Sequence, residues 1–237
     1  RDEFTARRLI AYFNVDLAKM QTEFEALPSV PPIAFNAKLI DSARAHSQDM
    51  LNHAYQGQTG SDGSTTGTRA TAAGYSYTII AENVFSYSDS VFYGHAGFEV
   101  DWGTEADGMQ TGRGHRANIH NADVREIGVG VVNGTNTIDG NTVGPELVTQ
   151  EFGTRSGLGP LLTGVAYFDF SGDHFYSVGE GLGEVTVTVD GASYSALTSP
   201  SGAFTVPLPG SGTYNVTFSG LGFCQTGTVT SSNGQNV

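Results

Sequence analysis

The stretch "EIGVGVVNGTNTIDGNTVGPELVTQEFG", residues 126–153, decides the fold of the first part of this chain. Its two ends, residues 126–133 and 146–153, are rich in β-branched residues, which favour strands. The polar segment between them contains Asp139-Gly140, a dipeptide typical of two-residue hairpin turns. The stretch therefore predicts two antiparallel strands.

Helical periodicity precedes this strand pair. A second helix is expected from about Asn36 to His53, and others near residues 68–73 and 90–102. Helices that come first and strands that come later predict an α+β sandwich, in which helices cover a small antiparallel sheet. The first helical pattern ends at Pro28, after apolar residues spaced three and four apart: Leu9, Phe13, Leu17, Met20 and Phe24.

The last third of the chain contains strand patterns alone. The composition changes near residues 153–160, and 237 residues are enough for two domains. We therefore expect one domain over residues 1–158 and a small all-β sandwich over residues 159–237. The single cysteine, Cys224, is expected to be a small buried hydrophobic residue on or beside a strand.

Charge and composition exclude several partners. Eleven basic and 24 acidic residues give a formal net charge of -13, which repels nucleic acids and anionic membranes. No apolar run approaches the roughly 20 residues that a membrane crossing needs. Scarce lysine and abundant Gly, Ser, Thr and Asn are a compositional hint of export. The opening "RDEFTARRLI" lacks the pattern of a secretory signal, so we expect a processed or trimmed chain.

Two histidines and one acidic motif form the first candidate site. His53 ends the second predicted helix, His115 lies in "GRGHRANI", and Glu82 lies in "AEN". If the fold gathers them, imidazole and carboxylate groups would form an open site for a divalent metal such as zinc. Each also has a plain structural reading, because a histidine at a helix end often caps carbonyl groups and Glu82 could bond backbone amides. His46 faces the same way as His53 and is expected to be packed or solvated.

The ordered series "HSQDM", His53, "AEN", "GHRANI", "EIGVGV" and "VTQEFG" resembles the CAP superfamily, whose domain is also called SCP, in its bacterial form. The resemblance covers roughly residues 1–155. It implies a secreted α-β-α sandwich, with a cleft that holds two histidines and two acidic residues.

By motif position, the resemblance assigns His53, His115 and Glu82 to this cleft, with the histidines as metal ligands. The second acidic residue is Glu99 or Asp101, and the spacing favours Asp101. Because aspartate is shorter than the glutamate usual in the family, we expect Asp101 to act from behind a ligand or through water.

Two functions fit such a cleft. The first is the binding of a metal and a small extracellular ligand such as a lipid, glycan or peptide, which we favour slightly. The alternative is metal-dependent, peptidase-like hydrolysis with Glu82 as general base, although two histidines are one ligand fewer than catalytic zinc usually has. No HExxH or GxSxG motif supports hydrolysis independently. Aromatic residues that could contact a ligand flank the motifs: Tyr75, Tyr77, Phe85, Tyr87, Phe92, Tyr93 and Trp102.

The segment "DFSGDHFYSVGE", residues 169–180, predicts a calcium loop. His174 departs from the pattern, because glycine normally occupies that sixth position to allow a positive φ. The plain alternative is an acidic turn between strands. The expected ligands stand at positions 1, 3, 5, 7, 9 and 12 of the loop: Asp169, Ser171, Asp173, Phe175, Ser177 and Glu180.

The second domain, with "GVAYFDF" before the loop and "EVTVTVDG" after it, resembles the prealbumin-like B repeats of bacterial surface adhesins. That resemblance implies a calcium-stabilised spacer or adhesive module without chemistry of its own. Taken together, these interpretations predict a monomeric protein that is secreted or displayed at the cell surface.

Overall fold

The computed structural model describes residues 2–237, which form two compact units. The described part of the first unit comprises residues 2–30 and 35–156, and the second comprises residues 31–34 and 157–237. The sequence did not predict that residues 31–34 join the second unit. Among the described residues, no helix is long and apolar enough to cross a membrane.

The first unit is built on a four-stranded sheet with the order β1-β3-β6-β2. The predicted strand pair is confirmed, because β3 (Glu126–Asn133) runs antiparallel to β6 (Glu146–Thr154) with Glu126 opposite Gly153. The outer strands are β1 (Ala34–Phe35) and β2 (Ile79–Ser88).

The polar segment between β3 and β6 forms a short hairpin of its own. Its strands are β4 (Asn136–Ile138) and β5 (Asn141–Val143), and they pair antiparallel. Asp139 and Gly140 both have positive φ, 51° and 84°, as the predicted two-residue turn requires.

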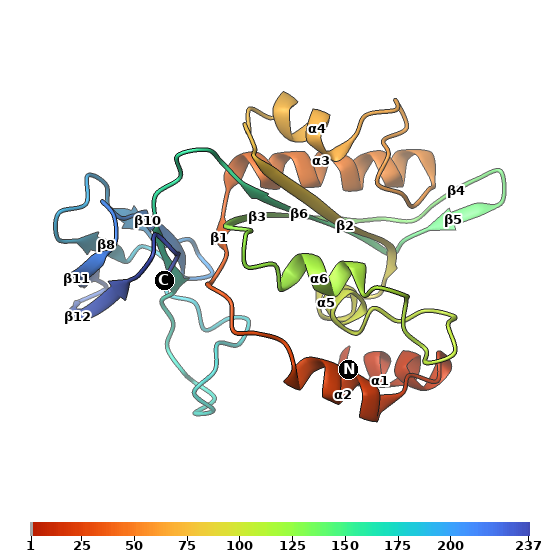
Figure 1. Ribbon diagram of the computed structural model, residues 1–237, viewed down its shortest axis with the longest axis horizontal. Coiled ribbons are helices and arrows are strands. Elements are labelled where there is room, and N and C mark those ends of the chain that lie inside the picture. Colours follow the sequence, from red (N-terminus) through yellow and green to blue (C-terminus); the bar gives the residue numbers. More distant parts are fainter. Residues whose placement is uncertain (1) are drawn as a thin grey trace. The chain divides into compact units, whose positions relative to one another are not determined.

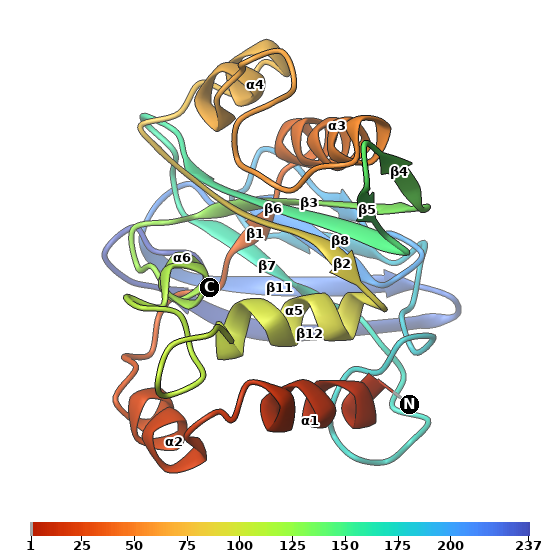
Figure 2. The same cartoon turned by 90° about the vertical axis from the view of Figure 1, so that its right-hand side faces the viewer.

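Helices cover both faces of this sheet (Figures 1 and 2). On one face lie α3 (Ala37–His53) and α4 (Thr66–Ala72). On the other lie α5 (Val91–Val100) and α6 (Gly114–Ile119), with a further layer beyond them made by α1 (Asp2–Tyr12) and α2 (Leu17–Glu25). The α+β expectation is confirmed for this unit.

The first helical pattern is interrupted, which the sequence reading missed. Asn14 adopts the left-handed conformation (φ 53°), and the carboxylate of Asp16 then caps α2 by accepting the amide of Lys19 at 2.9 Å. Asparagine tolerates this conformation and aspartate is a favoured N-cap, so the break has local causes.

Helix α3 packs directly on β3 through two glycines of the "EIGVGV" motif. A Cβ atom at Gly128 would lie 2.0 Å from the carbonyl carbon of Leu39, and one at Gly130 would lie 2.2 Å from the amide nitrogen of Arg44. Both contacts are with helix backbone, which cannot move aside as a side chain can. These glycines therefore set how closely α3 approaches the sheet.

The second unit contains strands but no helices among its described residues. Strand β7 (Leu161–Val165) pairs with β10 (Ala203–Pro207). A four-stranded sheet has the order β12-β11-β8-β9. Its strands are β8 (Thr186–Val189), β9 (Ala196–Leu197), β11 (Gly212–Gly220) and β12 (Phe223–Ser231).

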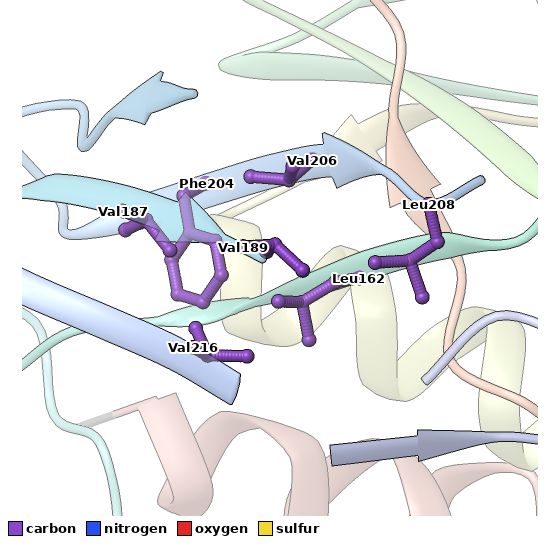
Figure 3. Close-up of a cluster of buried hydrophobic side chains, with 7 residues drawn as sticks. All are labelled: Leu162, Val187, Val189, Phe204, Val206, Leu208 and Val216. Carbon is purple, nitrogen blue, oxygen red and sulfur yellow. The ribbon is translucent and has the colours of Figure 1, made fainter. Parts of the chain in front are cut away.

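Both sheets of the second unit contribute to one core (Figure 3). Val187 and Val189 of β8 meet Phe204 and Val206 of β10, and Leu162 of β7 joins them. The unit is therefore all-β with a core shared by two sheets. The expectation for Cys224 is wrong in one respect, because it lies on β12 but is exposed.

We expect Gly130→Ala to lower the free energy of unfolding of the first unit by about 2–3 kcal/mol, because overpacking a rigid contact forces backbone shifts. Faster hydrogen exchange of the amides of α3 and β3 will report the loss. Gly227→Ala, in β12, is the control, since a Cβ atom there meets nothing within 4 Å. Equal exchange in the two variants would contradict the proposed close contact.

Candidate functional site

The "AEN" motif on β2 sends its two polar side chains to opposite faces of the sheet, as successive strand residues do. Glu82 accepts hydrogen bonds from Arg69 (2.7 Å to Oε1) and Thr66 (3.1 Å to Oε2), both on α4. Asn83 instead donates from Nδ2 to the carbonyl oxygen of His115 on α6 (3.1 Å). Glu82 and His115 are therefore separated by the sheet.

The expected gathering of His53, His115 and Glu82 in one cleft is wrong. His53 ends α3, which covers the face opposite to α6 (Figure 1), and its side chain is 55% exposed. Its Nδ1 lies 2.9 Å from Oδ1 of Asp49, one helical turn earlier. Within residues 2–237, no group of three or more His, Cys, Asp or Glu side chains is placed to hold a metal ion. The residues present do not fit the predicted divalent-metal centre.

His115 is paired instead with Asp101. The fully buried Asp101 caps the end of α5 in a left-handed conformation (φ 56°). Its Oδ1 lies 2.6 Å from Nδ1 of His115, and its Oδ2 accepts the backbone amide of His115 at 3.0 Å. Asp101 thus contacts both the ring and the backbone amide of His115. The ring contact favours the His115 tautomer with the proton on Nδ1, which leaves the Nε2 lone pair free.

The structure separates the two candidates for the second acidic residue. Asp101 touches His115, whereas Glu99 contacts other imidazoles, at 3.0 Å from Nε2 of His120 and 3.7 Å from Nε2 of His95. Glu99 does not contribute to the His115 pair.

An amide network that the sequence reading missed supports this pair. Asn83 also donates to Oε1 of Gln150 (3.1 Å) and accepts from Nδ2 of Asn118 (2.8 Å). Asn118 lies on α6, so Asn83 joins that helix to β2 and to β6. The only signal in the sequence is the asparagine of "AEN" and that of "GHRANI".

A pocket of about 200 Å³ opens beside His115. Of the aromatic residues expected near a ligand, only Phe85 and Trp102 line it. Tyr75 and Tyr93 are core residues, and Tyr77, Tyr87 and Phe92 are exposed. The remaining lining residues are Phe13, Gln56, Val84, Gly97, Phe98 and Gln110. The walls are thus mainly apolar, with one imidazole and two amides as the polar groups.

The first unit matches a known protein family. The model of the CAP family, the cysteine-rich secretory protein family, matches residues 26–152. The chain belongs to the CAP family. No curated protein matches it.

Two solved structures are similar to parts of the chain. An extracellular protein with an SCP domain from Bacillus anthracis is 21% identical, with a TM-score of 0.41, over 53% of this chain and 35% of that one. An outer surface protein of Borrelia burgdorferi is 13% identical, with a TM-score of 0.39, over 62% of this chain and 91% of that one. The chain spans about a third of the length of the Bacillus anthracis protein.

The opposite face of the CAP sheet encloses a pair of carboxyl groups. Glu82 and Glu151 lie directly across from each other on β2 and β6, and both are buried. Oε1 of Glu151 accepts a hydrogen bond from Ser42 (2.8 Å), whereas Oε2 has no partner. Burial, reinforced by repulsion from Glu82, raises the pKa of Glu151 to about 8. Burial also raises the pKa of Glu82, but the Arg69 guanidinium offsets part of that increase.

His46 lies on this side of the sheet, at a pocket of about 500 Å³ that Asp49, Ser61 and Arg69 also line. Its ring is fully buried, and Nε2 lies 2.9 Å from the carbonyl oxygen of Gly57. Burial, followed by the charge of Arg69, lowers the pKa of His46 to about 4. The imidazole is therefore neutral at ordinary pH, which matches the expectation of a packed histidine.

In the second unit, the predicted calcium loop is organised around backbone amides. Glu180 accepts the amides of Phe170 (3.0 Å), Ser171 (3.1 Å) and Ser177 (2.8 Å). Asp169 accepts those of Gly172 and His174, and Asp173 accepts that of Phe175. The three carboxylates do not share one centre. His174 adopts the positive φ of 63° that the sixth position requires. The calcium assignment stays a prediction that rests on the spacing of the sequence and on the resemblance to adhesin repeats.

We expect the CAP unit to lose stability as the pH rises, because the folded Glu151 holds its proton and the unfolded one does not. The contribution of protonated Glu151 to the free energy of unfolding is complete below pH ~4.5. It declines by up to about 1.4 kcal/mol per pH unit as the pH rises, and it is lost above pH ~8. Glu151→Gln should remove the decline and raise the unfolding temperature at pH 9. Glu25→Gln, at an exposed helix position, should leave it unchanged. A parallel pH profile for parent and Glu151→Gln would refute the assignment.

We expect Glu180→Gln to destabilise the folded conformation of residues 167–180. The NH2 group of the new side chain would face backbone N–H groups whose hydrogen bonds it cannot accept, and the lost hydrogen bonding costs about 1–3 kcal/mol. Limited proteolysis and hydrogen exchange of this loop measure the effect, with the exposed Glu184→Gln as control. The loss should appear both with calcium and with a chelator, because it comes from the amide bonds. A loss seen only in calcium would show instead that the carboxylate serves the ion.

Proposed function

We propose that the CAP unit is an extracellular binding module, and that its His115 pocket accepts one small ring or side chain of a larger molecule. The observation that carries this proposal is the His115–Asp101 pair at the wall of an aromatic pocket. A pocket of about 200 Å³ is below the roughly 300–1,000 Å³ of sites for whole drug-sized ligands, so only part of a ligand enters.

The polar groups of the pocket favour a hydroxylated ligand. With its Nδ1 proton held by Asp101, His115 presents Nε2 as an acceptor and prefers a donor such as a hydroxyl group. Gln56 and Gln110 add amide groups that accept or donate. Phe85, Phe98 and Trp102 supply apolar faces that suit a sugar ring, a sterol ring or a tyrosine.

The proposed location is outside the cell. The scarcity of lysine and the abundance of Gly, Ser, Thr and Asn suit an exported protein, and the family is described as secretory. The similar proteins are described as extracellular and outer-surface proteins. We propose the same location for this chain.

A second candidate function is hydrolysis with His115 as general base. An imidazole oriented by a buried carboxylate is the arrangement that activates a water molecule or a hydroxyl group in many hydrolases. The metal-dependent form of this alternative, with Glu82 as base, lacks support because Glu82 lies on the other face of the sheet. Binding is favoured, since no nucleophilic side chain lines the pocket among the described residues.

Trp102 is the only tryptophan of the chain and reports directly on the pocket. We expect one of three probes, an N-acetylhexosamine oligosaccharide, a sterol sulfate or a tyrosine-containing peptide, to change its fluorescence in a saturable way. His115→Ala and Asp101→Asn should each weaken binding of that probe about tenfold, the equivalent of one hydrogen bond between neutral groups. His95→Ala is the control, because His95 lies on the same side of the sheet but is half exposed and outside the pocket.

Unchanged Trp102 emission with all three probes, or equal affinity in the His115→Ala variant, would overturn the binding proposal. Mass spectrometry of the same mixtures tests the alternative. Cleavage of a probe that is lost in both His115→Ala and Asp101→Asn would establish hydrolysis in its place.

A further inference from the structure

The long connection between β7 and β8, cyan in Figure 1, exposes large apolar side chains in close succession. Phe168 is 57% exposed, Phe170 74%, Phe175 76% and Val178 99%. Soluble domains rarely expose contiguous apolar groups, and those that do usually have an interaction site. The rings of Phe168 and Phe170 lie 4.7 Å apart, so part of this surface is continuous.

This segment, residues 167–180, is built to hold its shape. Its carboxylates point inward to the backbone amides already described, and the amide of Phe168 donates to the carbonyl oxygen of Glu180 (2.9 Å). Tyr167 also bridges to Gly181 across the base of the loop. The loop therefore keeps its apolar residues outside, while many of its backbone amides, including those of Phe168, Phe170 and Ser177, have hydrogen-bond acceptors within the loop. Satisfied donors remove the main cost of moving a backbone into an apolar medium.

We propose that residues 167–180 bind the surface of a zwitterionic lipid bilayer by inserting Phe168, Phe170, Phe175 and Val178 into its interfacial region. Phe170, Phe175 and Val178 are 74–99% exposed, so only an occupant that surrounds them can bury them, and Phe168 lies against Phe170. A lipid interface does so without a preformed hollow, whereas protein contacts place such anchors in fitted pockets.

Charge decides which lipid surface fits. Asp169 and Asp173 lie among the apolar residues, and the segment contains no lysine or arginine. The chain as a whole carries -13, so an anionic bilayer repels it. The ammonium groups of zwitterionic lipids, in contrast, interact favourably with exposed aromatic faces such as those of Phe170 and Phe175.

Flotation with vesicles tests the proposal on the full chain. We expect the protein to float with vesicles of pure phosphatidylcholine, and the double variant Phe170→Ser, Phe175→Ser to partition at least about tenfold more weakly. Leu221→Ser is the matched control, because Leu221 is also exposed in this unit but lies outside the loop. It should bind within about twofold of the parent. Replacing a fifth of the lipid by phosphatidylglycerol should weaken binding, and added salt should reverse that loss.

The expected folding of both variants is checked by circular dichroism, since the substituted side chains are exposed. Absence of flotation with phosphatidylcholine, or equal flotation of the double variant and parent, overturns the proposal. A concentration-dependent dimer that the double variant loses, without lipid binding by the parent, would assign the loop to a second copy of the chain and also overturn it. Stronger binding to phosphatidylglycerol vesicles would refute the charge argument.

Discussion

The alternation of side chains along β2 is the constraint on which the rest of the CAP unit depends. Neighbouring residues of a strand point to opposite faces, so Glu82 and Asn83 cannot serve the same site. Glu82 turns toward α3 and α4, where Arg69 neutralises it. Asn83 turns toward α6 and holds the backbone of His115. One tripeptide therefore supports two different environments, one on each side of a sheet.

The side chains in these two environments differ in their exposure to solvent. On the α3 side, Glu151 and His46 have no exposed surface, and the glycines of β3 bring α3 down onto the sheet. A buried carboxyl pair in such a place is costly, and the protein accommodates it by raising the pKa of Glu151 and pairing Glu82 with Arg69. On the α6 side, His115 stays partly exposed beside an open pocket. A pocket of about 500 Å³ also opens on the α3 side, and His46, Asp49 and Arg69 are among the residues that line it, but the carboxyl groups of Glu82 and Glu151 do not.

In the loop formed by residues 167–180 of the second unit, polar and apolar side chains are arranged opposite to the usual pattern of a surface loop. The carboxylates of this loop point inward and its phenylalanines point outward. The spacing that suggests a calcium loop and the spacing that satisfies backbone amides are alike, because both need oxygen atoms directed to the interior of a tight turn. Sequence spacing alone does not distinguish them. The exposed apolar residues, in contrast, are a direct observation of the structure.

The sequence by itself determined the local structure: the paired strands at 126–133 and 146–153, the turn at Asp139-Gly140, the long helix that ends at His53, and the family. These depend on backbone preferences and on periodicity between near neighbours, which a single sequence displays. The resemblance already favoured Asp101 as the second acidic residue of the cleft, and only the tertiary structure decided that Glu82 and His53 lie across the sheet from His115. Which face each helix covers depends on contacts between residues far apart in the chain, and no local pattern in the sequence encodes that choice.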